Sequence, residues 1–82
     1  MKLVITSAPK LRKEIELEYD ANAVYDTLNA RLESIETQLN VSIDIIKNGD
    51  VVELLCDSQI NPMLFSFIGD IAKHELKKLA LA

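Results

Sequence analysis

The chain has 82 residues, of which 49% are hydrophobic and 27% are charged. A chain of this length supports one hydrophobic core, so we expect a single domain over residues 1–82. The composition excludes the disordered and low-complexity classes. Nine Lys and Arg against thirteen Asp and Glu give a net charge of −4. This charge argues against direct binding of nucleic acid, because a phosphate backbone is bound by basic surfaces.

The expected location follows from the cysteine content and from the apolar segments. Cys56 is the single cysteine, which excludes an internal disulfide and fits the reducing cytoplasm. The apolar run over residues 3–5 is too short for a signal peptide, and no window approaches the length of a membrane span. We therefore expect a cytoplasmic protein that does not bind membranes.

The first two elements are expected to be strands, at residues 2–6 and 13–19, with a turn-like break at residues 7–9. In the second segment apolar and acidic residues alternate with the period of two that is typical of a half-buried strand. A helix is the alternative for residues 10–19, because some of their apolar positions also fit helical spacing. The alternating residues are Ile15, Leu17 and Tyr19 with Glu14, Glu16 and Glu18.

A helix is predicted to follow, with Asp20 as its N-cap and an end near Asn40. Apolar residues repeat there at spacings of three and four, which gives the helix one narrow apolar stripe. That stripe is typical of a helix that lies on a sheet. Its members are Val24, Leu28, Leu32, Ile35 and Leu39.

Residues 41–57 predict a β-hairpin around Asn48-Gly49, the dipeptide that favours a type I′ turn with positive φ at both residues. With Lys47 opposite Asp50, six side chains would form the face toward the core, and Ile46, Val51 and Leu55 would point away from it. We expect the second face to be only partly covered. The six are Val41, Ile43, Ile45, Val52, Leu54 and Cys56.

The last element is predicted to be a helix that begins at Asn61-Pro62, a cap followed by proline at the first helical position. Its expected core face consists of Leu64, Ile68, Ile71 and Leu79, widened by Phe67 and Ala72. Glu75 falls within this stripe. We expect the helix to extend past the core at Glu75, and the alternative is an ion pair of Glu75 with Arg12 or Lys13.

These elements predict an α+β fold, a small two-layer sandwich with a mainly antiparallel sheet and two helices on one face. The element order is β-β-α-β-β-α, or β-α-β-β-α if residues 10–19 are not a strand. In the shorter order, the layout, size and acidic balance are similar to those of the small DinI-like modulators of the recombinase filament.

No group of residues predicts a catalytic, metal or cofactor site, so we expect a protein that is not an enzyme. Asp70 and His74 lie one helical turn apart, but two ligands do not make a metal site. Ser66 and His74 are about 12 Å apart along a helix, too far for a nucleophile and its base. We expect Cys56 to be a buried, unreactive thiol.

The surplus of apolar positions favours a protein-binding module, an adaptor or regulator that is a homodimer and acts through the surplus apolar surface of the sheet. The expected contact residues are Ile46, Val51 and Leu55, with Met63 and Phe65 as contributors and Glu14, Glu16 and Glu18 as an electrostatic contact. The alternative function is an acidic decoy. Such a decoy would mimic DNA and inhibit a protein that handles nucleic acid, with an origin in a phage or mobile element.

Overall fold

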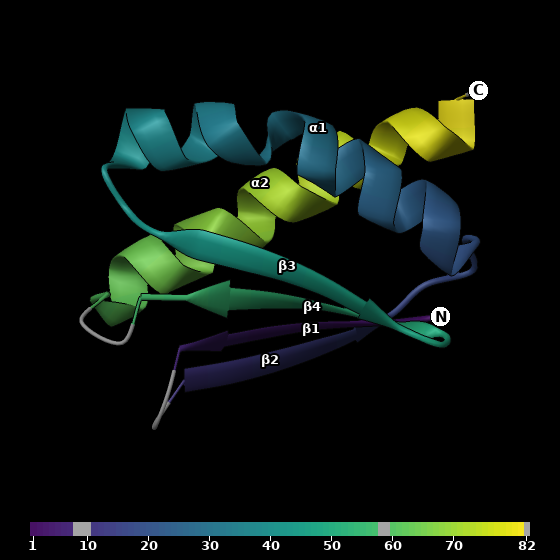
Figure 1. The fold of residues 1–82 in the computed structure, drawn as a ribbon, viewed down its shortest axis with the longest axis horizontal. Helices are drawn as coiled ribbons and strands as arrows, with labels where there is room; N and C mark the ends of the chain where they lie inside the picture. Colours follow the sequence, from purple (N-terminus) through teal and green to yellow (C-terminus); the bar gives the residue numbers. More distant parts are fainter. Residues whose placement is uncertain (8–10, 58–59, 82) are drawn as a thin grey trace.

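The computed structural model describes residues 1–7, 11–57 and 60–81. Within these residues the chain forms four strands and two helices in the order β-β-α-β-β-α (Figure 1). The predicted turn at residues 7–9 lies mostly outside the described residues. The elements are β1 Lys2–Ser7, β2 Leu11–Glu16, α1 Ala21–Leu39, β3 Ile43–Asn48, β4 Val51–Cys56 and α2 Pro62–Leu81.

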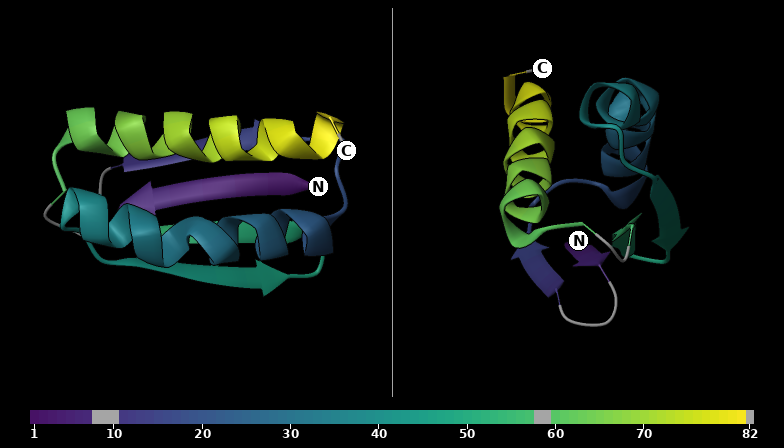
Figure 2. Two further views of the ribbon diagram at one scale, coloured as in Figure 1. Left: turned by 90° about the horizontal axis from the view of Figure 1, so that it is seen from above. Right: turned by 90° about the vertical axis from the view of Figure 1, so that its left-hand side faces the viewer.

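The strands form one mixed sheet in the spatial order β2-β1-β4-β3. The two outer pairs are antiparallel hairpins, and the central β1–β4 pair is parallel. Both helices lie side by side on one face of this sheet (Figure 2). The α+β two-layer fold predicted from the sequence is therefore confirmed, in the longer of the two element orders. The similarity of layout to DinI-like proteins required the shorter order and does not hold.

The second strand begins two residues earlier and ends three residues earlier than the predicted range 13–19, and the helical alternative for its residues is wrong. Residues 11–16 pair with β1, and their burial alternates along the strand. Hydrogen bonds of 2.9 and 3.0 Å join the backbones of Met1 and Leu17 at the end of this hairpin. Glu18 and Tyr19 follow the strand and lead to α1.

The β3–β4 hairpin is confirmed, but its predicted turn and register are wrong. Gly49 has a φ of 63°, whereas Asn48 has no positive φ and belongs to β3. Positive φ at only the first of two central residues is the pattern of a type II′ turn, not type I′. Asn48 faces Val51, whereas the prediction placed Lys47 opposite Asp50. Each residue of β3 therefore pairs with a residue two positions further along β4 than predicted. Because side chains alternate with a period of two, this shift keeps each side chain on its predicted face.

The core lies between the helices and the sheet, and α1 contributes to it as predicted. Asp20 accepts a hydrogen bond from the Ala23 backbone at 3.2 Å and so caps the helix. Asn40, with a φ of 53°, ends the helix in the left-handed conformation. The largest fully buried side chains are Leu3, Ile5, Val24, Leu28, Val52, Ile68 and Leu76.

Helix α2 begins as predicted, and Ile68 and Ala72 of its predicted core face are buried, but the helix is rotated so that Phe65 takes the place of Phe67 in the core. The Asn61 side chain accepts a hydrogen bond from the Leu64 backbone at 2.8 Å, as a cap does. Phe65 is only 7% exposed and belongs to the core, whereas Phe67, predicted to widen the core face, is 50% exposed. The reason is that α2 carries two overlapping apolar stripes, and the buried one runs through Phe65, Ile68, Ala72 and Leu76.

Glu75 is buried, so the expectation that the helix extends past the core at this residue is wrong. The side chain is 5% exposed, and its carboxylate lies 3.2 Å from Arg31 of α1 and 2.8 Å from Lys78. An ion pair was the alternative, but Arg12 and Lys13 are not its partners. Arg31 is in reach because α1 and α2 pack against each other.

Candidate protein-binding surfaces

The structure places the predicted contact residues on two separate faces. Ile46, Val51 and Leu55 lie on the face of the sheet that the helices leave open. Met63 lies in the first turn of α2, in the helical layer. Phe65 is in the core, which takes it out of any surface. The predicted apolar residues therefore do not form one patch.

The open sheet face is half charged. Ile46 is 46% exposed, and Val51 and Leu55 are half-buried between charged neighbours. Four carboxylates and two cations give this face a net charge of −2. Such a mixture is typical of a sheet face in contact with water. From the strand register, its members are Lys2, Val4, Thr6, Arg12, Glu14, Glu16, Asp44, Ile46, Asn48, Val51, Glu53 and Leu55.

The predicted acidic contact is partly neutralised within the chain. The Glu14 carboxylate lies 3.3 Å from the ammonium of Lys2 and 3.2 Å from the guanidinium of Arg12. Hydrogen bonds from Lys2 and then Arg12 lower the pKa of Glu14 below its ordinary value. Glu16 and Glu18 are exposed. Glu14 is therefore already paired and offers a partner less attraction than the sequence pattern indicates.

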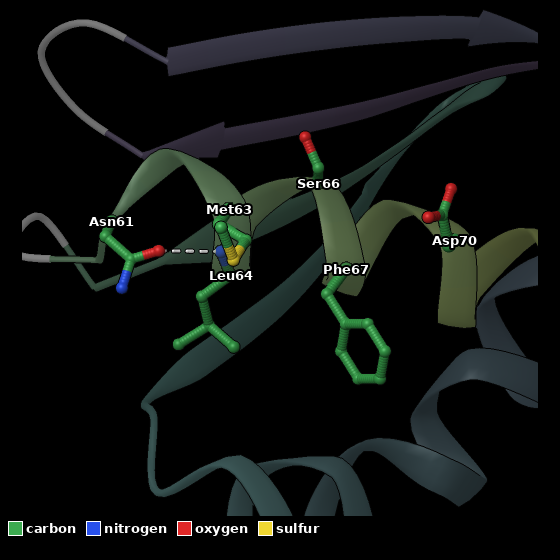
Figure 3. A pocket seen from close by; sticks show the side chains of 6 residues that line it. All are labelled: Asn61, Met63, Leu64, Ser66, Phe67 and Asp70. Atoms are coloured by element: carbon green, nitrogen blue, oxygen red, sulfur yellow. Dashed lines mark hydrogen bonds between the residues drawn. The ribbon is translucent and has the colours of Figure 1, made fainter.

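A second apolar surface, which the sequence did not predict as a unit, lies on the first half of α2. Met63 is 83% exposed and Phe67 50% exposed, and they stand one helical turn apart. They border an open hollow of about 500 Å³. In Figure 3, Leu64 and Phe67 extend to one side of the helix and Ser66 and Asp70 to the other. We call this the α2 surface: Asn61, Met63, Leu64, Ser66, Phe67 and Asp70.

The α2 surface continues into a groove between the two helices. Phe67 and Asp70 also line this second hollow, of about 360 Å³, together with Ile35 of α1. The ion pair of Arg31 with Glu75 lies in the same groove. The Lys78 ammonium, which donates a hydrogen bond to Glu75, lowers the pKa of this carboxyl, and Arg31 acts in the same direction against the effect of burial.

The residues considered for chemistry are not brought together into a centre. Ser66, Asp70 and His74 are exposed along α2. Among residues 1–7, 11–57 and 60–81, no group of three or more His, Cys, Asp or Glu side chains could hold a metal ion. Cys56 is buried in the core, as predicted, and burial raises the pKa of its thiol to about 11. In the described part of the chain, neither helix is long and apolar enough to cross a membrane.

Phe67 is the surface residue that the sequence analysis assigned to the core. The first half of α2 holds five large apolar residues within six positions. A helix that lies on a sheet buries one stripe. Five large apolar residues within six positions therefore cannot all face the core. This excess was visible in the sequence. The side on which it would appear was not, because it depends on the rotation of α2 against the sheet.

Comparisons of the chain with protein-family models, with curated proteins and with solved structures find no match.

Proposed function

We propose that this chain is a small cytoplasmic protein-binding module, a homodimeric adaptor or regulator without enzymatic activity, which binds its partner through the α2 surface. One observation carries the proposal: among the side chains that the structure describes, two of the three large exposed hydrophobic ones, Met63 and Phe67, stand together beside a hollow. Grouped apolar exposure with a concave border is typical of an interaction site.

The α2 surface supports the proposal better than the open sheet face does. Phe67 is an aromatic side chain at the junction of two hollows, and such residues supply most of the binding energy in many interfaces. The open sheet face has no comparable aromatic group, and half of its side chains are charged. Val51 and Leu55 remain predicted contacts of secondary importance.

The chemistry of the α2 surface fits a partner segment that combines a large apolar side chain with a basic one. The apolar side chain would fill the hollow beside Phe67 and Met63. The basic group would face Asp70, which is exposed and has no ion pair with any residue that the structure describes. The net charge of −4 also favours encounter with a cationic partner.

Site-specific photo-crosslinking tests this proposal directly. A photoreactive amino acid replaces Met63, whose side chain is the most exposed apolar group of the α2 surface. We expect it to capture one protein reproducibly, through a segment that contains both an apolar and a basic residue. The matched control places the same group at Thr37, an exposed residue of α1 that lies outside this surface.

The control defines the contradicting result. Equal capture of the same protein from position 37 would mean that the α2 surface does not direct binding. Capture through segments without a common composition would contradict the proposed partner chemistry. The acidic decoy remains the alternative function, but the ion pairs of Glu14 reduce its support. Its partner would bind through the acidic residues and not through position 63.

A further inference from the structure

We propose that the second copy in the homodimer binds at the free edge of β3, where the two β3 strands pair antiparallel and join the sheets of both copies. This inference rests on the dimeric state in the proposed function and assigns it a site. The pairing is centred on Ile46, a large hydrophobic residue that is 46% exposed and lies outside the α2 surface.

The hydrogen bonds of the hairpin show which backbone groups face this edge. The Asp57 N–H donates to the Ser42 carbonyl at 3.0 Å, and these two residues continue the β3–β4 register. In an antiparallel ladder, alternate residues bond to the neighbouring strand. The even-numbered residues of β3 therefore bond to β4. Ile43, Ile45 and Lys47 turn their N–H and C=O groups outward.

One of these outward groups is already occupied. The Ile43 N–H donates to the Glu36 side chain at 3.1 Å. This bond agrees with the assignment that the odd-numbered residues of β3 point their backbone groups away from β4. Among the described residues, no partner is recorded for the N–H groups of Ile45 and Lys47. The edge that can accept another strand is therefore short and begins after Ile43.

Only one two-fold register fits this edge. In a pairing centred on Ile45, Ile43 would exchange hydrogen bonds with Lys47 of the other copy, but the Ile43 N–H already donates to Glu36. A pairing centred on Lys47 would place two ammonium groups opposite each other, which is destabilising. Centred on Ile46, each Ile45 exchanges both backbone hydrogen bonds with Lys47 of the other copy. Ile46 then meets its own copy and Asp44 faces Asn48, while the two Lys47 side chains are diagonal neighbours and do not stand directly opposite each other.

The helices lie differently over the two edge strands of the sheet. Seen from above, α2 lies over β2, whereas β3 lies outside α1 (Figure 2). Tyr25 and Leu32 occupy the same flank of α1 as Glu36, because they precede it by eleven and four residues. This flank faces β3, since Glu36 bonds to Ile43. The half-buried Tyr25 and Leu32 would gain apolar contact from a second copy.

Disulfide trapping tests the register. Cys56→Ala removes the native thiol, and Ile46→Cys introduces one at the two-fold axis. Residues that face each other without hydrogen bonds in an antiparallel pair have Cα atoms about 4.5 Å apart, within the range of a disulfide. We expect mild oxidation to convert this variant to a covalent dimer. In the same background, Asn48→Cys is the matched control, because its two copies would be about 13 Å apart.

Sedimentation of chains without the new cysteines completes the test. We expect the wild-type chain to have twice the 9.2 kDa mass of one copy. Ile46→Asp should weaken the dimer at least tenfold, and Met63→Asp should not. Crosslinking at position 48 as efficient as at 46, or a wild-type mass of one copy, would overturn the inference. A single copy that pairs with an extended peptide at β3 would also do so.

The dimer site at β3 and the binding role of the α2 surface can be tested separately. Ile46 lies on the open face of the sheet, whereas Met63 and Phe67 lie in the helical layer. Photo-crosslinking through position 63 is therefore repeated with Ile46→Asp. We expect capture to persist in this variant, because the two surfaces are separate. Partner capture by an otherwise wild-type chain that has the mass of one copy would contradict only the dimer site. Loss of specific capture from a chain that still forms the trapped dimer would contradict only the proposed binding role of the α2 surface.

Discussion

Gly49 and Gly69 occupy backbone positions with opposite requirements, so one substitution should have opposite effects at the two sites. Gly49 has a φ of 63°, which strains a residue with a Cβ atom. Gly69 lies inside α2, and an added Cβ would be 3.6 Å from the Lys13 Nζ atom, an ordinary contact distance. The sequence identified the first glycine as a turn residue. It did not show that the second has room for a methyl group.

We expect Gly49→Ala to lower the free energy of unfolding by about 1–2 kcal/mol, the cost of a left-handed residue with a side chain. Gly69→Ala should raise it by up to about 1 kcal/mol, because alanine favours helix over glycine. Denaturant titrations of the two variants check both signs. Equal destabilisation by the two substitutions would contradict the expectation that the surroundings of Gly69 accommodate a methyl group.

Cys56 should be protected from thiol reagents while the chain is folded. Burial raises the pKa of its thiol from 9.0 to about 11. At pH 8 the reactive thiolate is then about 100-fold rarer than in an unfolded chain. We expect modification to be at least about 100-fold slower without denaturant than in it. Fast modification of the native chain at pH 8 would show that the thiol is accessible.

Glu75 shows, at the scale of elements, how a residue that breaks the apolar pattern can connect two helices. Its carboxylate joins Arg31 of α1 with Lys78 of α2, and it is almost fully buried. The sequence showed that a carboxylate lay within the apolar stripe. It could not identify the partner, because the distance from Arg31 to Glu75 depends on how α1 and α2 pack.

We expect Glu75→Gln to lower the free energy of unfolding by about 1–2 kcal/mol at pH 7, less than for a fully buried pair because both cations are half exposed. The ion pair lowers the pKa of Glu75 below 4.5. Its stabilisation is therefore fully present above that pH and is lost as the pH falls through the lower folded value.

The difference between the wild-type and Glu75→Gln chains should thus become smaller in acid. Thermal unfolding at pH 7 and pH 3 measures it. Glu33→Gln, on the exposed side of α1, is the matched control and should have little effect at either pH. A constant difference across this range would mean that the charge of Glu75 does not contribute.

The elements themselves could be predicted to different degrees. The starts of both helices followed from caps, since Asp20 and Asn61 occupy the N-cap positions. The second strand followed from alternation, but neither its start nor its end did, because both depend on how far β1 can pair. The core face of α2 could be predicted only in part. Ile68 and Ala72 are buried as expected, but Phe65 and Phe67 fit two overlapping apolar stripes equally well.

For the whole molecule, the two-layer fold could be predicted from element order, and the sheet topology could not. The parallel β1–β4 pair in the centre joins segments about fifty residues apart, such as Leu3 and Val52. No local pattern encodes such a contact. The candidate surfaces follow from this topology, because it separates Ile46 from Met63. Apolar excess in the sequence could therefore indicate binding but not divide the residues between two surfaces.

We propose that the partner binds the α2 surface mainly by apolar contact. The most direct measurement titrates the segment captured through position 63 against the wild-type, Phe67→Ala and Thr37→Ala chains at low and moderate salt. We predict at least tenfold weaker binding for Phe67→Ala, no change for Thr37→Ala, and a small salt effect. Unchanged affinity with Phe67→Ala, or affinity that falls steeply with salt in all three chains, would contradict it.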